Sequence, residues 1–110
     1  MVGRVRRSAR RRETNMAMVV SAVWTAIEGH EDAVAEALRS LAAASRDEPG
    51  NHVYEVYVDD AEPQVFRIFE QYEDEAAFQA HVDSPHFDEH GTRGGIPHLE
   101  GRERRTFRSL

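Results

Sequence analysis

The chain contains no cysteine among its 110 residues. Without a thiol it has no disulfide, no thiolate nucleophile, no iron–sulfur cluster and no cysteine-bound zinc. The apolar runs are also too short to cross a membrane. We therefore expect no membrane partner. Because cysteine-free chains suit a reducing compartment, we also expect a cytoplasmic protein. The length is enough for one domain, and apolar residues at 40% suffice for a small core.

Common nucleotide and hydrolase motifs are absent as well. There is no G-x-G-x-x-G fingerprint and therefore no sign of a dinucleotide fold, and no G-x-S-x-G nucleophile elbow. The glycine-rich segment 91–95 (G-T-R-G-G) lacks the lysine and the strand-before, helix-after context of a phosphate loop. We therefore expect no nucleotide cofactor.

Positive charge is concentrated at the N-terminus. Six of the 14 basic residues lie in the first twelve positions. Residues 14–110 carry eight arginines against nineteen acidic residues, a formal charge of −11. An acidic domain argues against a nucleic-acid-binding face, so no nucleic-acid partner is expected.

The first 17 residues are predicted to form a disordered, arginine-rich extension, because such a segment has too few apolar groups to pack. Three interpretations stay open. The segment could bind polyanions, or it could be a targeting peptide, although it lacks the apolar stretch of a secretory signal. It could also be a solvated extension, or one that is not translated if synthesis begins at Met16 or Met18.

The remaining residues, 18–110, are predicted to form one α+β domain with a four-stranded antiparallel sheet. The order of the expected elements is β-α-β-β-α-β, the ferredoxin-like arrangement. Asp74 is a good N-cap for the second helix, and Ser84 followed by Pro85 predicts a further short helix. The strands are expected at 19–27, 51–59, 64–72 and 102–109, the first helix at 31–45, and a loop at 91–95.

One face of this sheet would carry no helix. The apolar residues expected there are too numerous to be left in water, and burial against a second copy is the simplest remedy. We therefore expect a homodimer. The residues assigned to this face are Val19, Val23, Ile27, Val53, Tyr57, Val65 and Phe69.

The helix-facing side of the sheet is predicted to hold the functional site. Side chains at alternate positions of a strand share a face, and one such set combines aromatic rings with a few polar groups. That mixture is typical of a pocket for a small, planar aromatic molecule. The residues assigned to substrate binding are Trp24, His52, Tyr54, Phe66, Glu70 and Tyr72.

Two histidines are the candidate catalytic residues. His81 lies one helical turn after Phe78, so its imidazole should face the sheet, where it could remove a phenolic or enolic proton. His86 lies in the first turn of the short helix, where the helix dipole disfavours a charged imidazole. Each is alternatively a structural histidine, bonded to the backbone or to its neighbours.

The other polar groups of the predicted pocket also have two interpretations. A half-buried Glu70 needs a partner, either a histidine that it orients or an arginine such as Arg102 or Arg104, and the ion pair is preferred. Trp24 and Tyr72 are either core residues or groups that orient the substrate through their polar atoms.

Six histidines raise the question of a metal. His86 and His90 are four residues apart and could share an ion on one helix face. No third ligand stands at a suitable spacing, so no metal site is predicted.

The segment from the end of the third strand onward carries a family resemblance. An aromatic strand end at Tyr72 is followed by D-E-A-A-F and then by H-x-x-S-P-H-F, which ends at Phe87. In these motifs the chain resembles the antibiotic biosynthesis monooxygenases, over about residues 18–109. The resemblance implies a dimeric α+β barrel in which two sheets pair. It also implies oxygenation of quinols or polycyclic phenols without flavin or metal, hence no cofactor, with dioxygen as co-substrate. The base would be His81 or His86, flanked by Tyr72 and Trp24.

The family contains other activities. Its haem-degrading members carry an Asn on the first strand and a Trp at the end of the third, where this chain has Ala22 and Tyr72, so haem degradation is disfavoured. Other relatives isomerise a phosphorylated sugar-like molecule. Such a substrate would need a basic pocket, so the acidic domain disfavours this activity, although Arg93 could bind the phosphate. A non-catalytic ligand-binding dimer is the third alternative. The glycines of segment 91–95 replace a longer amphipathic helix of the family, which predicts a more open pocket.

Overall fold

A computed structural model describes residues 17–110. The predicted extension therefore lies outside the described residues, apart from Ala17. Ala17 is buried, and its backbone N–H donates to Ser109 Oγ at 2.8 Å, so it belongs to the domain. The elements are β1 (Met18–Ala26), α2 (Glu31–Arg46), β2 (Asn51–Val58), β3 (Val65–Tyr72), α3 (Glu75–Val82), η1 (Phe87–Gly95), η2 (Ile96–His98) and β4 (Leu99–Arg108).

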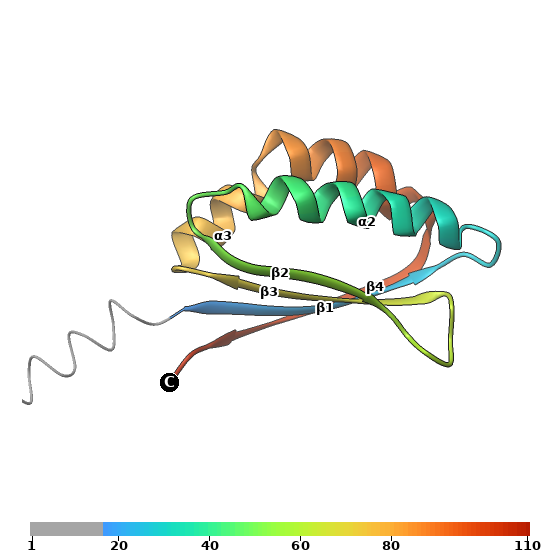
Figure 1. The fold of residues 1–110 in the computed structure, drawn as a ribbon, viewed down its shortest axis with the longest axis horizontal. Helices are drawn as coiled ribbons and strands as arrows, with labels where there is room; N and C mark the ends of the chain where they lie inside the picture. The colour runs from blue at the N-terminus through green and yellow to red at the C-terminus, as the bar shows by residue number, and fades with distance from the viewer. Residues whose placement is uncertain (1–16) are drawn as a thin grey trace, which may run out of the picture.

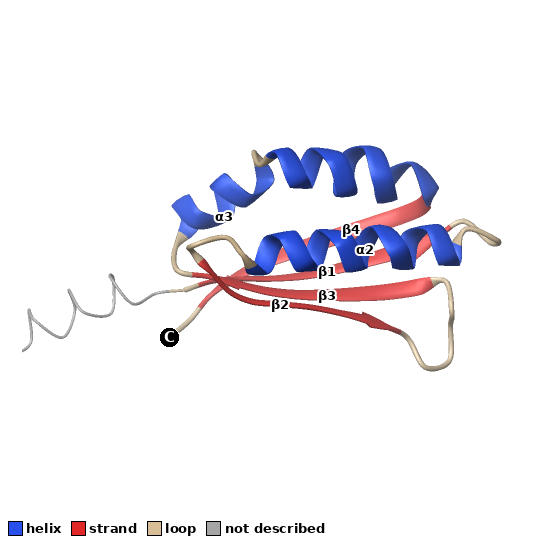
Figure 2. Cartoon of the chain, turned by 45° about the horizontal axis from the view of Figure 1, so that its top comes forward, coloured by secondary structure: helices blue, strands red, loops and turns tan. Residues whose placement is uncertain are grey.

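The ferredoxin-like order is confirmed. The four strands form one antiparallel sheet in the order β2-β3-β1-β4, and the helical segments all lie on one face of it (Figures 1 and 2). The Asp74 side chain caps α3 by accepting from the N–H of Ala77 at 2.8 Å, as predicted. Ser84 likewise accepts from the N–H of Phe87 at the start of η1.

The predicted loop at residues 91–95 is wrong. These residues form the second half of η1, a π-helix, which packs along α2. The glycines permit this close approach: a Cβ on Gly95 would lie 2.8 Å from the Trp24 ring and 3.3 Å from Ala37 Cβ. Glycine commonly ends a helix, whereas here it lets two helical segments touch.

The main core lies between the sheet and α2. Its buried residues alternate along the strands and recur at helical spacing in α2, so each element contributes one apolar face. The members are Ala22, Trp24, Ala26, Val34, Leu38, Leu41, Ala42, Tyr54, Phe66 and Ile68. A second cluster of Val20, Tyr72 and Phe78 lies under α3.

The opposite face of the sheet carries no helix (Figures 1 and 2). Large apolar side chains are exposed there, among them Tyr57 at 56%, Phe69 at 40% and Phe107 at 48%. Within the described residues, no helix is long and apolar enough to cross a membrane.

Candidate active site

A pocket of about 370 Å³ opens between the sheet, α3 and η1. Aromatic and aliphatic side chains form most of its wall, and an imidazole, two carboxylates and two guanidinium groups complete it. The lining residues are Ala22, Trp24, Tyr54, Ile68, Glu70, Phe78, His81, Val82, Phe87, Arg102, Glu103 and Arg104.

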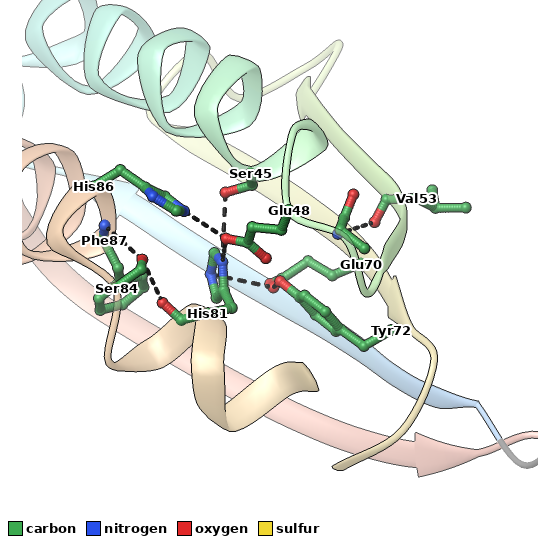
Figure 3. A network of polar contacts seen from close by, with 10 residues as sticks. Ser45, Glu48, Val53, Glu70, Tyr72, His81, Ser84, His86 and Phe87 are labelled. Carbon is green, nitrogen blue, oxygen red and sulfur yellow. Dashed lines mark hydrogen bonds and ion pairs between the residues drawn. The ribbon is translucent and has the colours of Figure 1, made fainter. Parts of the chain in front are cut away.

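His81 occupies the polar end of this pocket. Its helix presents it toward the sheet, and its side chain is 2% exposed. Nδ1 lies 2.8 Å from Glu48 Oε2, and Nε2 lies 3.7 Å from Glu70 Oε1 (Figure 3). A carboxylate oxygen can only accept, so the contact with Glu48 places the proton on Nδ1 and leaves the Nε2 lone pair free in the neutral ring. Burial lowers the pKa of His81, and the hydrogen bond to Glu48 opposes part of this effect.

Glu48 links both predicted catalytic histidines. It follows the C-terminal end of α2, and its Oε2 lies 2.5 Å from His86 Nε2 as well as beside His81. Figure 3 shows the carboxylate between the two imidazoles. His86 does not line the pocket, and its side chain is 24% exposed. Of the two histidines, only His81 therefore reaches both Glu48 and the pocket.

Glu70 and Tyr72 form a second buried polar pair. The Tyr72 hydroxyl donates to Glu70 Oε1 at 2.6 Å. Burial raises the pKa of the Tyr72 phenol, and the Glu70 charge adds to the rise, so the hydroxyl stays protonated as a donor. Burial also raises the pKa of Glu70 to about 7, against the lowering effects of the Tyr72 hydrogen bond and the Arg104 charge. Glu70 is thus a carboxyl group that can gain or lose a proton near neutral pH.

Two arginines stand at the rim of the pocket. Arg102 and Arg104 are opposite Trp24 and Ala22 in the β1–β4 ladder, so they share the helix-facing side of the sheet. The Arg104 guanidinium lies 5.2 Å from the centre of the Phe78 ring. Neither arginine forms an ion pair with Glu70 among the described residues, so the preferred interpretation of Glu70 was wrong. Both cations face the pocket instead.

The predicted substrate-binding residues divide into three groups. Trp24, Tyr54 and Glu70 line the pocket. Tyr72 is not a lining residue, but its hydroxyl is hydrogen-bonded to Glu70, and its ring centre lies 5.3 Å from that of His81. His52 and Phe66 do not line this pocket.

The prediction that His52 shares a strand face with Tyr54 is wrong, because β2 is irregular at this point. The β2–β3 register shifts between Asn51 and Val53, which breaks the simple alternation, and His52 is exposed. Phe66 faces the helices as predicted, but it lines a separate hollow at the other end of α2.

Glu48 was not predicted. It comes from a loop 33 residues before His81, and no local pattern in the sequence marks it. Phe78 and Phe87 also line the pocket, and both belong to the motifs on which the resemblance rests.

Comparison with known proteins identifies the family and the fold. The family model for antibiotic biosynthesis monooxygenases matches residues 17–92. The chain belongs to the antibiotic biosynthesis monooxygenase family. The solved structure of PA3566 from Pseudomonas aeruginosa is 30% identical, with a TM-score of 0.82 over 88% of this chain and 97% of that one. SO0527 from Shewanella oneidensis is 26% identical, with a TM-score of 0.80 over 86% and 92%.

A structure named as an antibiotic biosynthesis monooxygenase is 23% identical, with a TM-score of 0.79 over 84% of this chain and 98% of that one, and it shows the shared fold. No curated protein matches the chain. The matched residues include the four polar residues of the site, Glu48, Glu70, His81 and His86. The match ends before β4, which carries Arg102 and Arg104.

Proposed function

We propose that this protein is a cofactor-independent monooxygenase of a quinol or another phenolic aromatic molecule. The observation that carries the proposal is the orientation of His81. Its Nδ1 is held by Glu48, and its Nε2 lies on the side of the pocket, beside Glu70. A carboxylate that holds one imidazole nitrogen fixes the tautomer in which the other accepts a proton.

In the proposed reaction, Nε2 of His81 takes the proton of a phenolic hydroxyl. The resulting anion passes one electron to dioxygen, and the two radicals combine to form a carbon–oxygen bond. The peroxide intermediate then loses water. For a hydroquinone the products are a hydroxyquinone and water, so one oxygen atom enters the ring and the other leaves with two hydrogens. The substrate supplies all the electrons, and the protein supplies a base, an orientation and shielding from water.

The pocket wall suits such a substrate. Trp24, Phe78 and Phe87 provide aromatic surfaces against which a planar ring can pack. Glu70, with its pKa of about 7, can pass the proton from His81 onward. Arg102 and Arg104 line the same pocket, and their positive charges can hold the oxygen atoms of a bound phenol.

Oxygen uptake tests the proposal. Metal-free protein is mixed with a panel of small hydroquinones, beside a His81→Ala variant. We expect uptake with at least one substrate, lost in His81→Ala and retained in His52→Ala, which removes an exposed histidine outside the pocket. Absence of uptake by the wild type across the panel, or full uptake by His81→Ala, would contradict the proposal.

A homodimer is part of the proposal. Its support is the uncovered sheet face, with Tyr57, Phe69 and Phe107 exposed on it. We expect light scattering to give twice the mass of the chain, and Phe69→Glu to shift the protein toward the monomer. A wild type that stays monomeric at high concentration would contradict this part.

One observation favours a second candidate, the isomerase of a phosphorylated sugar-like substrate. The domain is acidic, but the pocket itself presents Arg102 and Arg104. Guanidinium groups bind phosphate strongly. Competition of inorganic phosphate with a bound phenol would favour this candidate, whereas binding unaffected by phosphate would favour the monooxygenase.

A further inference from the structure

We propose that Glu48, His81 and His86 form a binding site for a divalent transition-metal ion such as Zn²⁺. Two imidazole nitrogens and one carboxylate oxygen are ligand types that zinc and its neighbours prefer. In the structure these three ligand atoms all lie within 4.8 Å of one another. It is the one such group of three among the described residues.

The three ligands come from separate parts of the fold. Glu48 follows α2, His81 belongs to α3, and His86 immediately precedes η1. Figure 3 shows the side chains converging on one point from these elements. The two histidines are near each other in the sequence, and helix packing brings Glu48 to them from 33 residues before His81, so a metal ion would join α2 to the segment of α3 and η1.

Glu48 supplies an independent observation. Its side chain is 14% exposed, and its Oε2 contacts both imidazoles. Its Oε1 is buried with no hydrogen-bond partner. A buried carboxylate oxygen without a partner is costly. A cation bound beside the carboxylate would compensate this charge, whereas the two imidazoles satisfy only one of its oxygens.

The size of the cluster also fits. Metal–nitrogen distances of about 2.0–2.1 Å place tetrahedral ligand atoms about 3.3 Å apart. The observed separations from Glu48 Oε2 are 2.8 Å to His81 and 2.5 Å to His86. The Glu48 carboxylate would need to move away from each imidazole by less than about 1 Å to admit the ion. Three protein ligands leave at least one coordination position for water.

Metal binding would change what His81 can do. An imidazole that binds metal through Nδ1 carries its proton on Nε2, the nitrogen beside Glu70. That nitrogen would then donate instead of accept, so His81 would no longer serve as the base. We therefore expect the ion to inhibit the oxygenase. This consequence rests on the proposed function, but the metal site itself does not.

Metal titration tests the site. Protein made without a polyhistidine tag is stripped with a chelator and titrated with Zn²⁺ by calorimetry and with Co²⁺ by visible absorption. We expect one ion per chain. Glu48→Gln and His86→Ala should each weaken binding by at least about tenfold. His90→Ala is the matched control, because His90 pairs with Glu89 on the same helical segment and lies outside the cluster.

His30→Ala is a second control, since His30 and His98 form another close imidazole pair, with Nδ1 atoms 2.9 Å apart. Equal affinity in the wild type, Glu48→Gln and His86→Ala would overturn the site, as would loss of binding only in His30→Ala. Because His86 is partly exposed, His86→Ala should fold even if Glu48→Gln does not, and thermal unfolding without metal checks this. A chain that binds metal but oxidises no phenol would leave this site standing and remove only the proposed function.

Discussion

Two of the hollows on the helix-covered side of the molecule are of nearly equal size and very different character. One, of about 340 Å³, lies between α2, β2 and the loop at Pro63. The other, of about 370 Å³, contains His81. The first is lined by Glu31, Asp32, Ala35, Leu38, Arg39, Val56, Tyr57, Val58, Pro63 and Phe66. Its charged groups are half-buried or exposed, and none of its lining residues is a buried base.

The difference shows that volume does not distinguish the candidate site from the other hollow. What distinguishes the second hollow is buried chemistry: His81, Glu70 and Tyr72 are each at most 5% exposed and are within reach of one another. Burial shifts the pKa values of all three. Such clustering of shifted groups in a pocket is typical of functional sites.

The largest expected effect is that of His81→Ala. Loss of the base should lower kcat/KM for a phenol by about 10²- to 10⁴-fold. Arg39 lines the first hollow, together with Phe66, and Arg39→Ala should leave kcat/KM unchanged. Steady-state oxygen consumption measures both. If Arg39→Ala lowered kcat/KM as much as His81→Ala does, the hollow with His81 would not be the one that carries the activity, and the account would be contradicted.

The second effect concerns stability and pH. Folded Glu70 keeps its proton up to about pH 7, while in the unfolded chain it ionises near the ordinary value of 4.5. Between these values the folded state binds more protons, so the free energy of unfolding falls as pH rises and stays lower above about pH 7. The shift corresponds to a loss of about 3 kcal/mol.

Glu70→Gln cannot titrate and should lack this fall. Urea unfolding with a chelator present, at about pH 5 and about pH 8, measures the difference. Glu73→Gln, which replaces an exposed carboxylate just beyond the strand, should behave as the wild type. Parallel pH profiles for Glu70→Gln and the wild type would show that Glu70 is not the group responsible.

The smallest effect is that of Arg104→Ala. Loss of a cation at the rim should raise KM for a phenol by about tenfold and change kcat little, because an interaction with a charged group is worth about 1.5 kcal/mol. Arg39→Ala again provides the control from the other hollow. A change confined to kcat would instead indicate that Arg104 acts in the chemical step.

Much of the fold was predictable from local patterns. The strands at 19–27 and 64–72 agree with β1 and β3 to within one residue at each end, because apolar alternation and flanking turn residues mark them directly. The Asp74 cap was predictable for the same local reason. Segment 91–95 was not, since whether glycines break a helix or permit close packing depends on Trp24 and Ala37, which are distant in sequence.

The site was predictable only in part. Strand parity and helical spacing placed Trp24, Tyr54, Glu70 and His81 together, and the structure confirms that placement. Parity failed for His52, where the β2–β3 register shifts. Glu48 follows from no periodicity, because a loop residue is positioned by tertiary packing alone. For the same reason the sequence suggested only His86 with His90 as a possible metal pair, whereas the cluster of Glu48, His81 and His86 forms through tertiary packing and follows from no spacing.

The most direct test of the central claim is the fate of the oxygen atoms. A hydroquinone that supports oxygen uptake is turned over under oxygen-18 gas by the wild type and by His81→Ala, and the product is reduced at once to prevent exchange with water. We predict that the wild-type product carries one oxygen-18 atom per ring and that His81→Ala forms almost none. A product labelled from water instead of from dioxygen, or equal labelling by the variant, would contradict monooxygenation at His81.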